Sequence, residues 1–343
     1  MADLVFGFGT SHGPLLTIDP AIWGRSRTAD MMEIPRIHFR GNTYSYDELL
    51  ALRGAANFAK QNSLATRQAA FADCQRALDA LAARIREARL DAMIIIGDDH
   101  YEYFRRDIQP PFAVYCGESL VNCGFDPEAR TDLPEAVCEI LAASCPPRDE
   151  AYPIASELAL EIITQGIRDG FDVTSSEVQP VDPEGLRGIG HAVGFIVRRL
   201  LDDRPMALVP VLMNTYFEPN QPPVRRCFEF GRSMGRAVKT WKKDARVAVA
   251  GSGGLTHFAI DEELDRRLLR ALQERDLDTL LSVPENVLQA GTSEYKNWIA
   301  ALGVLWETEL EMDLIDYVPC YRSEAGTGAG MGFAAWTPAG PGG

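Results

Sequence analysis

V-A-V-A-G-S-G-G-L-T-H-F, at residues 247–258, is an apolar run followed by a glycine-rich turn that carries a histidine. The first four residues are apolar and include two β-branched valines, which is typical of a buried strand. The three glycines allow the backbone to turn sharply or to approach another group closely. Junctions between strands and loops often present the catalytic groups of α/β proteins. His257 is therefore either a solvated turn residue or a functional one, and its own surroundings leave both interpretations open.

Two further histidines follow apolar runs that are typical of strands. His12 comes after the run at 4–9, and His100 comes after the run at 92–96. A fourth, His191, lies among glycines ahead of another apolar segment. The chain has only five histidines, so their repeated placement at strand ends favours a shared site over unrelated turn residues.

Segments with a helical period alternate with strand-like runs along the chain. The spacing of apolar residues predicts helices over 64–89 and 222–241, each leading into a short buried strand. Residues 132–169 are expected to be mostly helical, with an interruption at Cys145-Pro146-Pro147. The glycine-rich segment 326–332 is interpreted as flexible or tightly turning, ahead of a last strand at 333–336.

The length of 343 residues, 46% of them hydrophobic, suffices for one large domain or two ordinary ones. No internal repeat and no linker divides the sequence. We therefore predict a single α/β domain over residues 1–343, with a central mixed sheet flanked by helices and a metal site at the strand ends. The less regular stretch at about 17–62 is interpreted as an elaboration of this domain.

The acidic composition narrows the classes of partner. The net charge of −15 would repel nucleic acid and an anionic membrane surface, so neither is expected as a partner. The seven cysteines, an odd number without a C-x-x-C pair, argue against a disulfide framework and for a reducing cytoplasm. The N-terminus does not resemble a signal peptide, and no apolar run is long enough to span a membrane. We expect a cytoplasmic protein that acts on a small molecule.

The histidines at strand ends, together with Glu294 at a predicted helix start, suggest a metal site. Two histidines and one carboxylate on one face of a divalent metal are the ligand set of non-haem Fe(II) oxygenases. The same ligands would suit a zinc-dependent hydrolase with His257 or an aspartate as the base. A metal-free binding protein with unrelated turn histidines is the remaining alternative, and spacing alone leaves all three open.

Five segments of the chain resemble a known family in their order and spacing: G-T-S-H-G-P at 9–14, I-G-D-D-H at 96–100, P-V-L-M-N-T at 210–215, G-S-G-G-L-T-H at 251–257 and E-Y-K-N-W at 294–298. The family is the class III extradiol ring-cleavage dioxygenases, which includes the catalytic β subunit of protocatechuate 4,5-dioxygenase. The segments at 23–26 and 39–49 are more similar to the 3-O-methylgallate dioxygenase branch.

The resemblance implies a role for each matching residue. The family's Fe(II) ligands fall on His12, His100 and Glu294. Its acid–base histidine falls on His257, and His191 matches a second histidine of the active site.

Residues near these positions supply further candidates. Asp98 and Asp99 could orient His100 through its second ring nitrogen, or could serve only as turn and capping residues. Four polar residues are candidate donors to the substrate: Asn214, Thr215, Thr256 and Thr327.

The function implied by the resemblance is O2-dependent ring opening of a catecholic acid. The substrate is expected to be 3-O-methylgallate-, gallate- or protocatechuate-like, in the catabolism of aromatic or lignin-derived compounds. The protocatechuate enzyme closes its site with a separate small subunit. Residues 17–62 are hypothesised to do part of this here, and a separate small subunit is not expected to be required. The chain is expected to form a homo-oligomer, a dimer.

Overall fold

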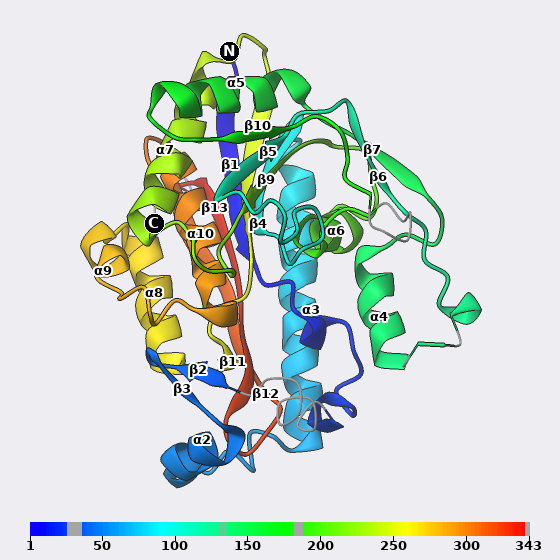
Figure 1. Ribbon diagram of the computed structural model, residues 1–343, viewed down its shortest axis with the longest axis vertical. Coiled ribbons are helices and arrows are strands. Elements are labelled where there is room, and N and C mark those ends of the chain that lie inside the picture. Colours follow the sequence, from blue (N-terminus) through cyan, green and yellow to red (C-terminus); the bar gives the residue numbers. More distant parts are fainter. Residues whose placement is uncertain (26–35, 131, 134, 182–187, 340–343) are drawn as a thin grey trace.

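The computed structural model describes residues 1–25, 36–130, 132–133, 135–181 and 188–339. Within these residues a nine-stranded mixed sheet forms the centre of a single α/β domain (Figure 1). Its strands are β1 (Asp3–Thr10), β4 (Ala92–Asp98), β5 (Phe112–Tyr115), β8 (Thr174–Ser176), β9 (Ala207–Met213), β10 (Arg246–Ser252), β11 (His257–Ala259), β12 (Leu310–Tyr321) and β13 (Thr327–Pro338). The spatial order is β11-β13-β1-β10-β4-β9-β5-β8, and β12 pairs with β13.

The four neighbouring strands β1, β10, β4 and β9 run parallel to one another. Their carboxyl ends therefore meet at one edge of the sheet, which is where α/β proteins place their sites. The antiparallel partners are β13 beside β1 and β5 beside β9. The predicted class, α/β with a central mixed sheet, is confirmed.

Helices cover both faces of this sheet. Their bounds are α2 (Tyr46–Arg53), α3 (Leu64–Glu87), α4 (Glu135–Ser144), α5 (Ser156–Arg168), α6 (His191–Phe195), α7 (Val224–Thr240), α8 (Glu262–Glu274), α9 (Leu277–Leu281) and α10 (Tyr295–Val304). Two smaller sheets pair β2 (Ile37–Phe39) with β3 (Asn42–Tyr44), and β6 (Ser119–Asn122) with β7 (Glu150–Pro153).

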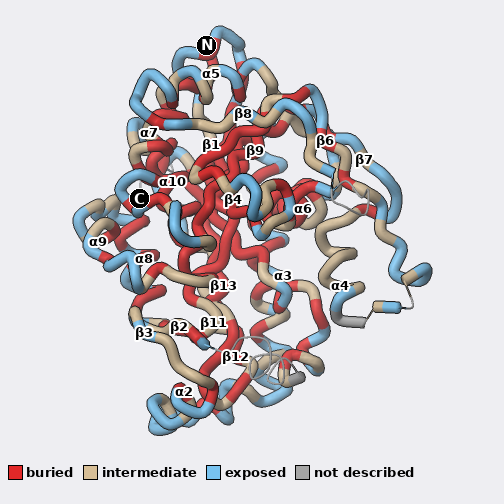
Figure 2. Tube along the Cα trace, viewed as in Figure 1, coloured by how far each residue is buried: buried red, intermediate tan, exposed pale blue. Residues whose placement is uncertain are grey.

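Alternate side chains of the central strands enter two different apolar cores. On β4, Ile94 and Ile96 pack on one face with α5, α7 and α10, whereas Met93 and Ile95 pack on the other with α3 and α6. Burial on both faces explains why these strands are continuous apolar runs in the sequence. Figure 2 shows the buried residues concentrated along the sheet, between the two helical layers.

Helix α10 is buried along its whole length. It packs on β10 and closely against α7, where Gly231 and Gly235 leave the necessary space. A Cβ atom on either glycine would collide with the carbonyl oxygens of Ala300 or Val304. This close contact fixes α10 in the core and holds its first turn beside the turn that follows β10.

One expectation from the sequence is wrong. The segment 326–332 is not flexible, because residues 327–338 form the long strand β13. The glycines there permit close packing: a Cβ atom on Gly332 would lie 2.8 Å from the Leu255 side chain. The stretch 132–169 contains the two helices α4 and α5, and the break expected at Cys145-Pro146-Pro147 is followed by the strand β7, which was not predicted.

The sequence led us to expect an elaboration of the domain at about residues 17–62, of which residues 26–35 lie outside the described residues. We call residues 36–58 of this stretch the arm. The arm contains β2, β3 and α2 and packs on β11 through a small apolar cluster. Arg53 donates to the carbonyl oxygens of Ile260, Ala325 and Gly326 at 2.7–3.1 Å. The arm is thereby attached to the strand that begins with His257.

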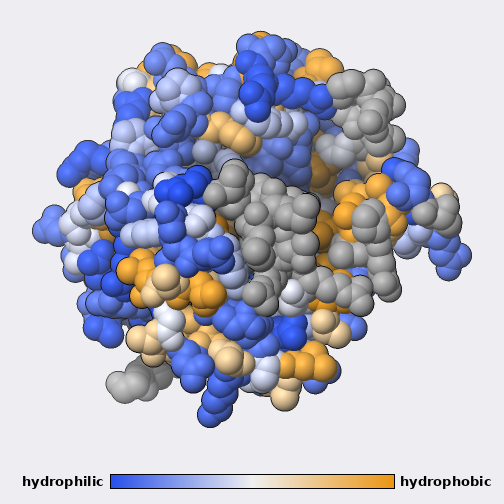
Figure 3. Space-filling model, turned by 60° about the horizontal axis from the view of Figure 1, so that its bottom comes forward, coloured by the Kyte–Doolittle hydropathy of each residue, from blue (hydrophilic) through white to orange (hydrophobic). Residues whose placement is uncertain are grey.

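The face shown in Figure 3 is mostly hydrophilic where it is described, and its apolar side chains form small patches. Among the described helices, none has the length and apolar character needed to cross a membrane.

Candidate active site

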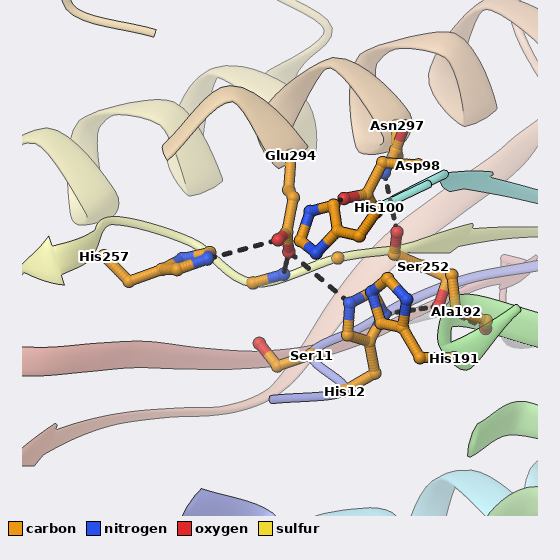
Figure 4. A network of polar contacts seen from close by, with 12 residues as sticks. Ser11, His12, Asp98, His100, His191, Ala192, Ser252, His257, Glu294 and Asn297 are labelled. Atoms are coloured by element: carbon orange, nitrogen blue, oxygen red, sulfur yellow. Dashed lines mark hydrogen bonds and ion pairs between the residues drawn. The ribbon is translucent and has the colours of Figure 1, made fainter. Parts of the chain in front are cut away.

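Four histidines and Glu294, all named from the sequence, converge at the carboxyl edge of the parallel strands (Figure 4). His12 follows β1 and His100 follows β4, while His257 is the first residue of β11. Glu294 ends a short 3-10 helix, Ala290–Glu294, directly before α10. His191 begins α6 and lies in the same cluster, with its ring centroid 4.6 Å from that of His12.

The contacts of His12 determine which of its nitrogens is available. The hydroxyl of Ser252 donates to the carbonyl oxygen of Ala192 at 2.8 Å, so its oxygen accepts from Nδ1 of His12, also at 2.8 Å. The remaining nitrogen, Nε2, lies 3.7 Å from a carboxylate oxygen of Glu294. Burial, reinforced by the neighbouring His191, lowers the pKa of His12 to about 4. The ring is therefore neutral with a lone pair facing the cluster, which is the form that binds metals.

Asp98 lies among the imidazoles rather than behind them. Its Oδ2 atom is 2.7 Å from Nε2 of His100, yet neither carboxylate oxygen accepts a hydrogen bond of good geometry from the described residues. Asp98 is buried, and its charge is favoured by the nearby histidines, first His100, which hold its pKa low despite burial. Burying a carboxylate that accepts no hydrogen bond costs free energy unless a nearby positive charge or a metal ion compensates its charge.

Two groups of potential ligands share Asp98. Its carboxylate lies with His100 and Glu294 in one group, and with His12 and His191 in the other, and the ligand atoms within each group are at most 4.8 Å apart. A cluster of imidazole and carboxylate donors of this size fits a divalent transition metal. The three ligands expected from the sequence are divided between the two groups, with His12 in one and His100 and Glu294 in the other, and Asp98 joins them.

His257 contacts Glu294 directly. Its Nε2 lies 3.1 Å from Oε1 of Glu294, and its Nδ1 lies 2.8 Å from the carbonyl oxygen of Leu255. Because a carbonyl oxygen only accepts, Nδ1 carries a proton, and Nε2 is the atom that can gain or lose one. Burial opposes the charged ring, but Glu294 and the Leu255 carbonyl outweigh it and raise the pKa of His257.

The E-Y-K-N-W segment fixes the glycine turn to the start of α10. Asn297 donates to the carbonyl oxygen of Ser252 at 2.8 Å, and Trp298 donates to that of Gly253 at 2.9 Å. The amide of Gly254 donates to Glu294, and a Cβ atom on Gly254 would lie 2.9 Å from the His257 ring. Each such hydrogen bond contributes about 1 kcal/mol net, and a buried carbonyl left unpaired would cost more.

Glu102 is a residue of the site that sequence reasoning missed. One carboxylate oxygen accepts from the backbone N–H of His191 at 2.8 Å, and the other lies 2.7 Å from its Nδ1. Asp99 accepts from the backbone amides of Glu102, Tyr103 and Phe104 at 2.8–3.2 Å, which is a turn-capping role. The sequence signal for Glu102 was its place two residues after His100.

The loop after β9 brings aromatic rings to the site. The ring of Tyr216 lies 4.7 Å from that of His100, and Phe217 stacks on Tyr101 at 3.8 Å. Asn214 holds this loop, because it donates to the carbonyl oxygen of Phe217 and accepts from its amide. These aromatic residues were not identified from the sequence.

The remaining candidate donors have different surroundings. The hydroxyl of Thr215 is buried and has no hydrogen-bond partner among the described residues. The hydroxyl of Thr256 donates to Asp265 at 2.8 Å, and that of Thr327 lies 2.6 Å from the Ser323 hydroxyl. Of these three hydroxyls, that of Thr215 is the one without a partner among the described residues.

Residues 61–328 match the model of a protein family described as the catalytic LigB subunit of aromatic ring-opening dioxygenase. The chain belongs to this family. It is therefore a ring-opening dioxygenase of the extradiol type, an oxidoreductase. The matched region contains His100, His191, His257 and Glu294, whereas His12 lies before it and is joined to the site only by the fold.

The chain is also similar to relatives named 2,3-dihydroxyphenylpropionate/2,3-dihydroxicinnamic acid 1,2-dioxygenase. The relative from Comamonas testosteroni is 26% identical over 277 residues, which is 76% of this chain and 75% of that protein. A relative from Rhodococcus sp is 28% identical over 53% of this chain and 51% of its own length. One from Klebsiella pneumoniae is 29% identical over 51% of this chain and 46% of its own. The match to the last two spans about half of each relative.

Proposed function

We propose that this LigB-family enzyme uses Fe(II) and O2 to open the ring of a catecholic aromatic acid. The observation that carries the proposal is the contact between His257 and Glu294. It places a group that can carry a proton at 3.1 Å from a candidate metal ligand, in a cluster that also contains the buried His12 and the more exposed His100.

His12, His100 and Glu294 would hold the metal. Two imidazoles and one carboxylate match the donor set of non-haem Fe(II) oxygenases and leave positions open for other ligands. When bound, Fe(II) supplies adjacent positions for the catechol and O2 and mediates the transfer of electron density between them. The Ser252–His12 contact favours this role, since it leaves Nε2 of His12 unprotonated and directed at the cluster.

His257 would act as the acid–base group through Nε2. Its Nδ1–H is held by Leu255, so the ring keeps one orientation while a proton moves at the opposite nitrogen. In this role it takes a proton from a catechol hydroxyl and returns it to the reacting oxygen. The burial of the ring limits exchange of this proton with water.

The substrate class follows from the family and from the lining of the site. The named relatives act on a catechol that bears a carboxylated side chain, and the sequence resemblance points to methylgallate-, gallate- or protocatechuate-like acids. All are catechols with an acidic group. The Tyr216 and Phe217 rings offer an apolar side for such a ring, and the Thr215 hydroxyl is a candidate donor to it.

The arm is proposed to form one side of the substrate entrance. It is attached to the end of β11 by Arg53, and it lies near the loop that carries Tyr216 and Phe217. Burial lowers the pKa of His38 in the arm, while the carboxylate of Glu218 in that loop opposes this effect, so the two segments are near each other. In this arrangement no separate small subunit is needed to complete the site.

The test uses full-length protein prepared without oxygen and loaded with Fe(II). It is mixed with O2 and, in separate reactions, protocatechuate, gallate, 3-O-methylgallate and 2,3-dihydroxyphenylpropionate. We expect O2 uptake matched by a yellow ring-opened product with at least one of them, and none with zinc-loaded protein or with His12→Ala. Full activity with zinc in the absence of O2, or no O2 uptake with a wider panel of catecholic acids, would overturn the proposal.

A further inference from the structure

Glu102 makes two contacts with a single residue. Its Oε1 atom accepts from the backbone amide of His191 at 2.8 Å, and its Oε2 atom lies 2.7 Å from the ring Nδ1 of the same histidine. One contact alone would let the imidazole rotate about its side-chain torsions. A carboxylate that holds both the backbone and the ring fixes where the ring lies relative to α6.

The second ring nitrogen of His191 is left for the site. Nδ1 is occupied by Glu102, so Nε2 is the atom available to the pocket. The His191 ring lies 4.6 Å from the His12 ring and 4.8 Å from the His100 ring, between centroids. A nitrogen of His191 also lies within 4.8 Å of potential ligand atoms on both Asp98 and His12.

The local structure is arranged to allow the Glu102–His191 contact. A Cβ atom on Gly190 would lie 3.0 Å from the Glu102 carboxylate and 3.1 Å from the Tyr103 ring, so a side chain at 190 would press on both. On the other side, Asp99 accepts from the amide of Glu102 and from the next two amides. The turn that presents His100 therefore also presents the carboxylate that holds His191.

An ion pair that is partly exposed contributes little to stability. The side chains of His191 and Glu102 are 26% and 33% exposed, so the ion pair by itself contributes only modestly to stability. Its geometry instead matches the carboxylate–imidazole pairs in which the carboxylate selects the tautomer and the orientation of a functional histidine.

We infer that Glu102 is a positioning residue for His191: it holds the backbone amide and ring Nδ1, and so directs Nε2 toward His12, His100 and Asp98. Glu102 acts through His191 and touches neither the metal ligands nor the substrate. The expected loss of kcat rests on the proposed function. The expected orientation and protonation pattern of the His191 ring do not.

Glu102→Gln is the informative substitution, because glutamine has the same length but only one acceptor oxygen. One of the two donors of His191 then faces an NH2 group. Either the ring reorients, or Nδ1 loses its proton and accepts from the amide while Nε2 becomes protonated. Glu102→Asp keeps the charge but is one methylene shorter, so it cannot make both contacts without a shift of the turn.

The structural test is independent of activity. Histidine ring nitrogens are labelled with 15N in the full-length protein, and two-bond proton–nitrogen correlations report the tautomer of each ring. The chain has only five histidines, and His191→Asn identifies the signal of interest. We expect Nδ1 of His191 to be protonated in the wild type and this pattern to change in Glu102→Gln while the other four histidines keep theirs. An unchanged His191 pattern would overturn the inference.

The kinetic test is a double-mutant cycle on ring opening with Fe(II)-loaded protein. We expect Glu102→Gln to lower kcat by about tenfold and His191→Asn by about a hundredfold or more, with metal content unchanged. Because Glu102 acts through His191, the double variant should equal His191→Asn within about twofold. Additive losses, or full activity of Glu102→Gln, would contradict the inference.

These outcomes separate the inference from the proposed function. A wild type that opens no catechol ring contradicts the proposed function, and the NMR experiment still decides the role of Glu102. If Glu102→Gln melts well below the wild type, Glu102→Asp replaces it in both experiments, with an intermediate loss expected.

Discussion

Nε2 of His257 lies 3.1 Å from Oε1 of Glu294, so the candidate proton carrier and a candidate metal ligand touch each other. They are 37 residues apart in the chain and belong to different elements, the start of β11 and the turn before α10. Three groups set this distance: the Leu255 carbonyl on the far side of the imidazole, the Gly254 amide on the carboxylate, and Thr292, whose hydroxyl contacts the backbone of His257.

Variants of the two histidines should separate metal binding from turnover. We expect His12→Ala to lose bound iron, since it removes one of the ligands, whereas His257→Ala should keep iron and lose turnover by about a hundredfold or more. Metal analysis of anaerobically loaded protein, followed by O2-uptake assays, checks both. Equal loss of iron in the two variants would reverse their assigned roles.

Gly291→Ala should disable His257 without touching a ligand. A Cβ atom on Gly291 would overlap the Cδ2 and Nε2 atoms of the His257 ring, so the imidazole must leave its position. We expect kcat to fall by about a hundredfold while iron content stays near that of the wild type. Gly54→Ala is the matched control, because a Cβ atom there meets nothing within 4 Å. Normal turnover of Gly291→Ala would show that His257 is not required in this position.

Ser252→Ala should weaken metal binding. Without the hydroxyl, Nδ1 of His12 loses the acceptor that keeps Nε2 unprotonated, and the ring can adopt the other tautomer. We expect the dissociation constant for the metal to rise by about 10- to 100-fold, measured by competition with a chelating dye. Ser233→Ala removes another buried hydroxyl, bonded to Asp169 and remote from the site, and should leave metal binding unchanged. A similar effect of both substitutions would indicate general destabilisation.

Asp265→Asn should change how stability depends on pH. Asp265 is fully buried, and burial raises its pKa to about 6, although Tyr317, Thr256 and Tyr295 donate to it. The folded protein thus holds this proton more tightly than the unfolded chain, in which an Asp has a pKa of about 4. The stability that this proton provides is complete below about pH 4 and is lost as the pH rises through about 6.

The expected size of this effect is about 3 kcal/mol, because the pKa of Asp265 in the folded protein lies roughly two above that in the unfolded chain. Urea unfolding of both proteins from pH 4 to pH 7.5 measures it. The free energy of unfolding of the wild type should fall relative to that of Asp265→Asn across this range, because only the wild type has the Asp265 carboxyl group to titrate. The histidines titrate in both proteins, so their contributions cancel in the comparison. A difference between the two proteins that does not vary with pH would contradict the prediction.

Arg53→Ala should release the arm from β11. The guanidinium donates to three carbonyl oxygens, and its loss should lower the free energy of unfolding by about 2 kcal/mol. Hydrogen exchange should increase at residues 257–260 and 323–327. If the arm borders the entrance, KM should rise more than kcat falls. The exposed Arg86 gives a control, Arg86→Ala, with the same change of charge; equal exchange in both variants would contradict the attachment.

The sequence by itself determined the class of fold and most of the chemical groups. Continuous apolar runs such as 92–96 are buried strands because the sheet is covered on both faces, and each run ends where its polar residues begin. His12, His100, His257 and Glu294 were selected because they follow such runs or start a helix. Local pattern suffices here, since strand and helix ends are set by neighbouring residues.

Only the tertiary structure decided how these groups meet. Glu102 and Asp98 gained their contacts from packing, because the turn after β4 faces the start of α6, a segment 89 residues away from Glu102 in the chain. The glycines of β13 allow a close approach of Leu255. From local sequence alone, such a glycine-rich strand cannot be distinguished from a flexible glycine-rich tail. The tautomer of His12 depends on Ser252 and Ala192, which come from two other elements. Contacts between distant segments follow from the complementarity of packed surfaces, and that property is not written in any one stretch of sequence.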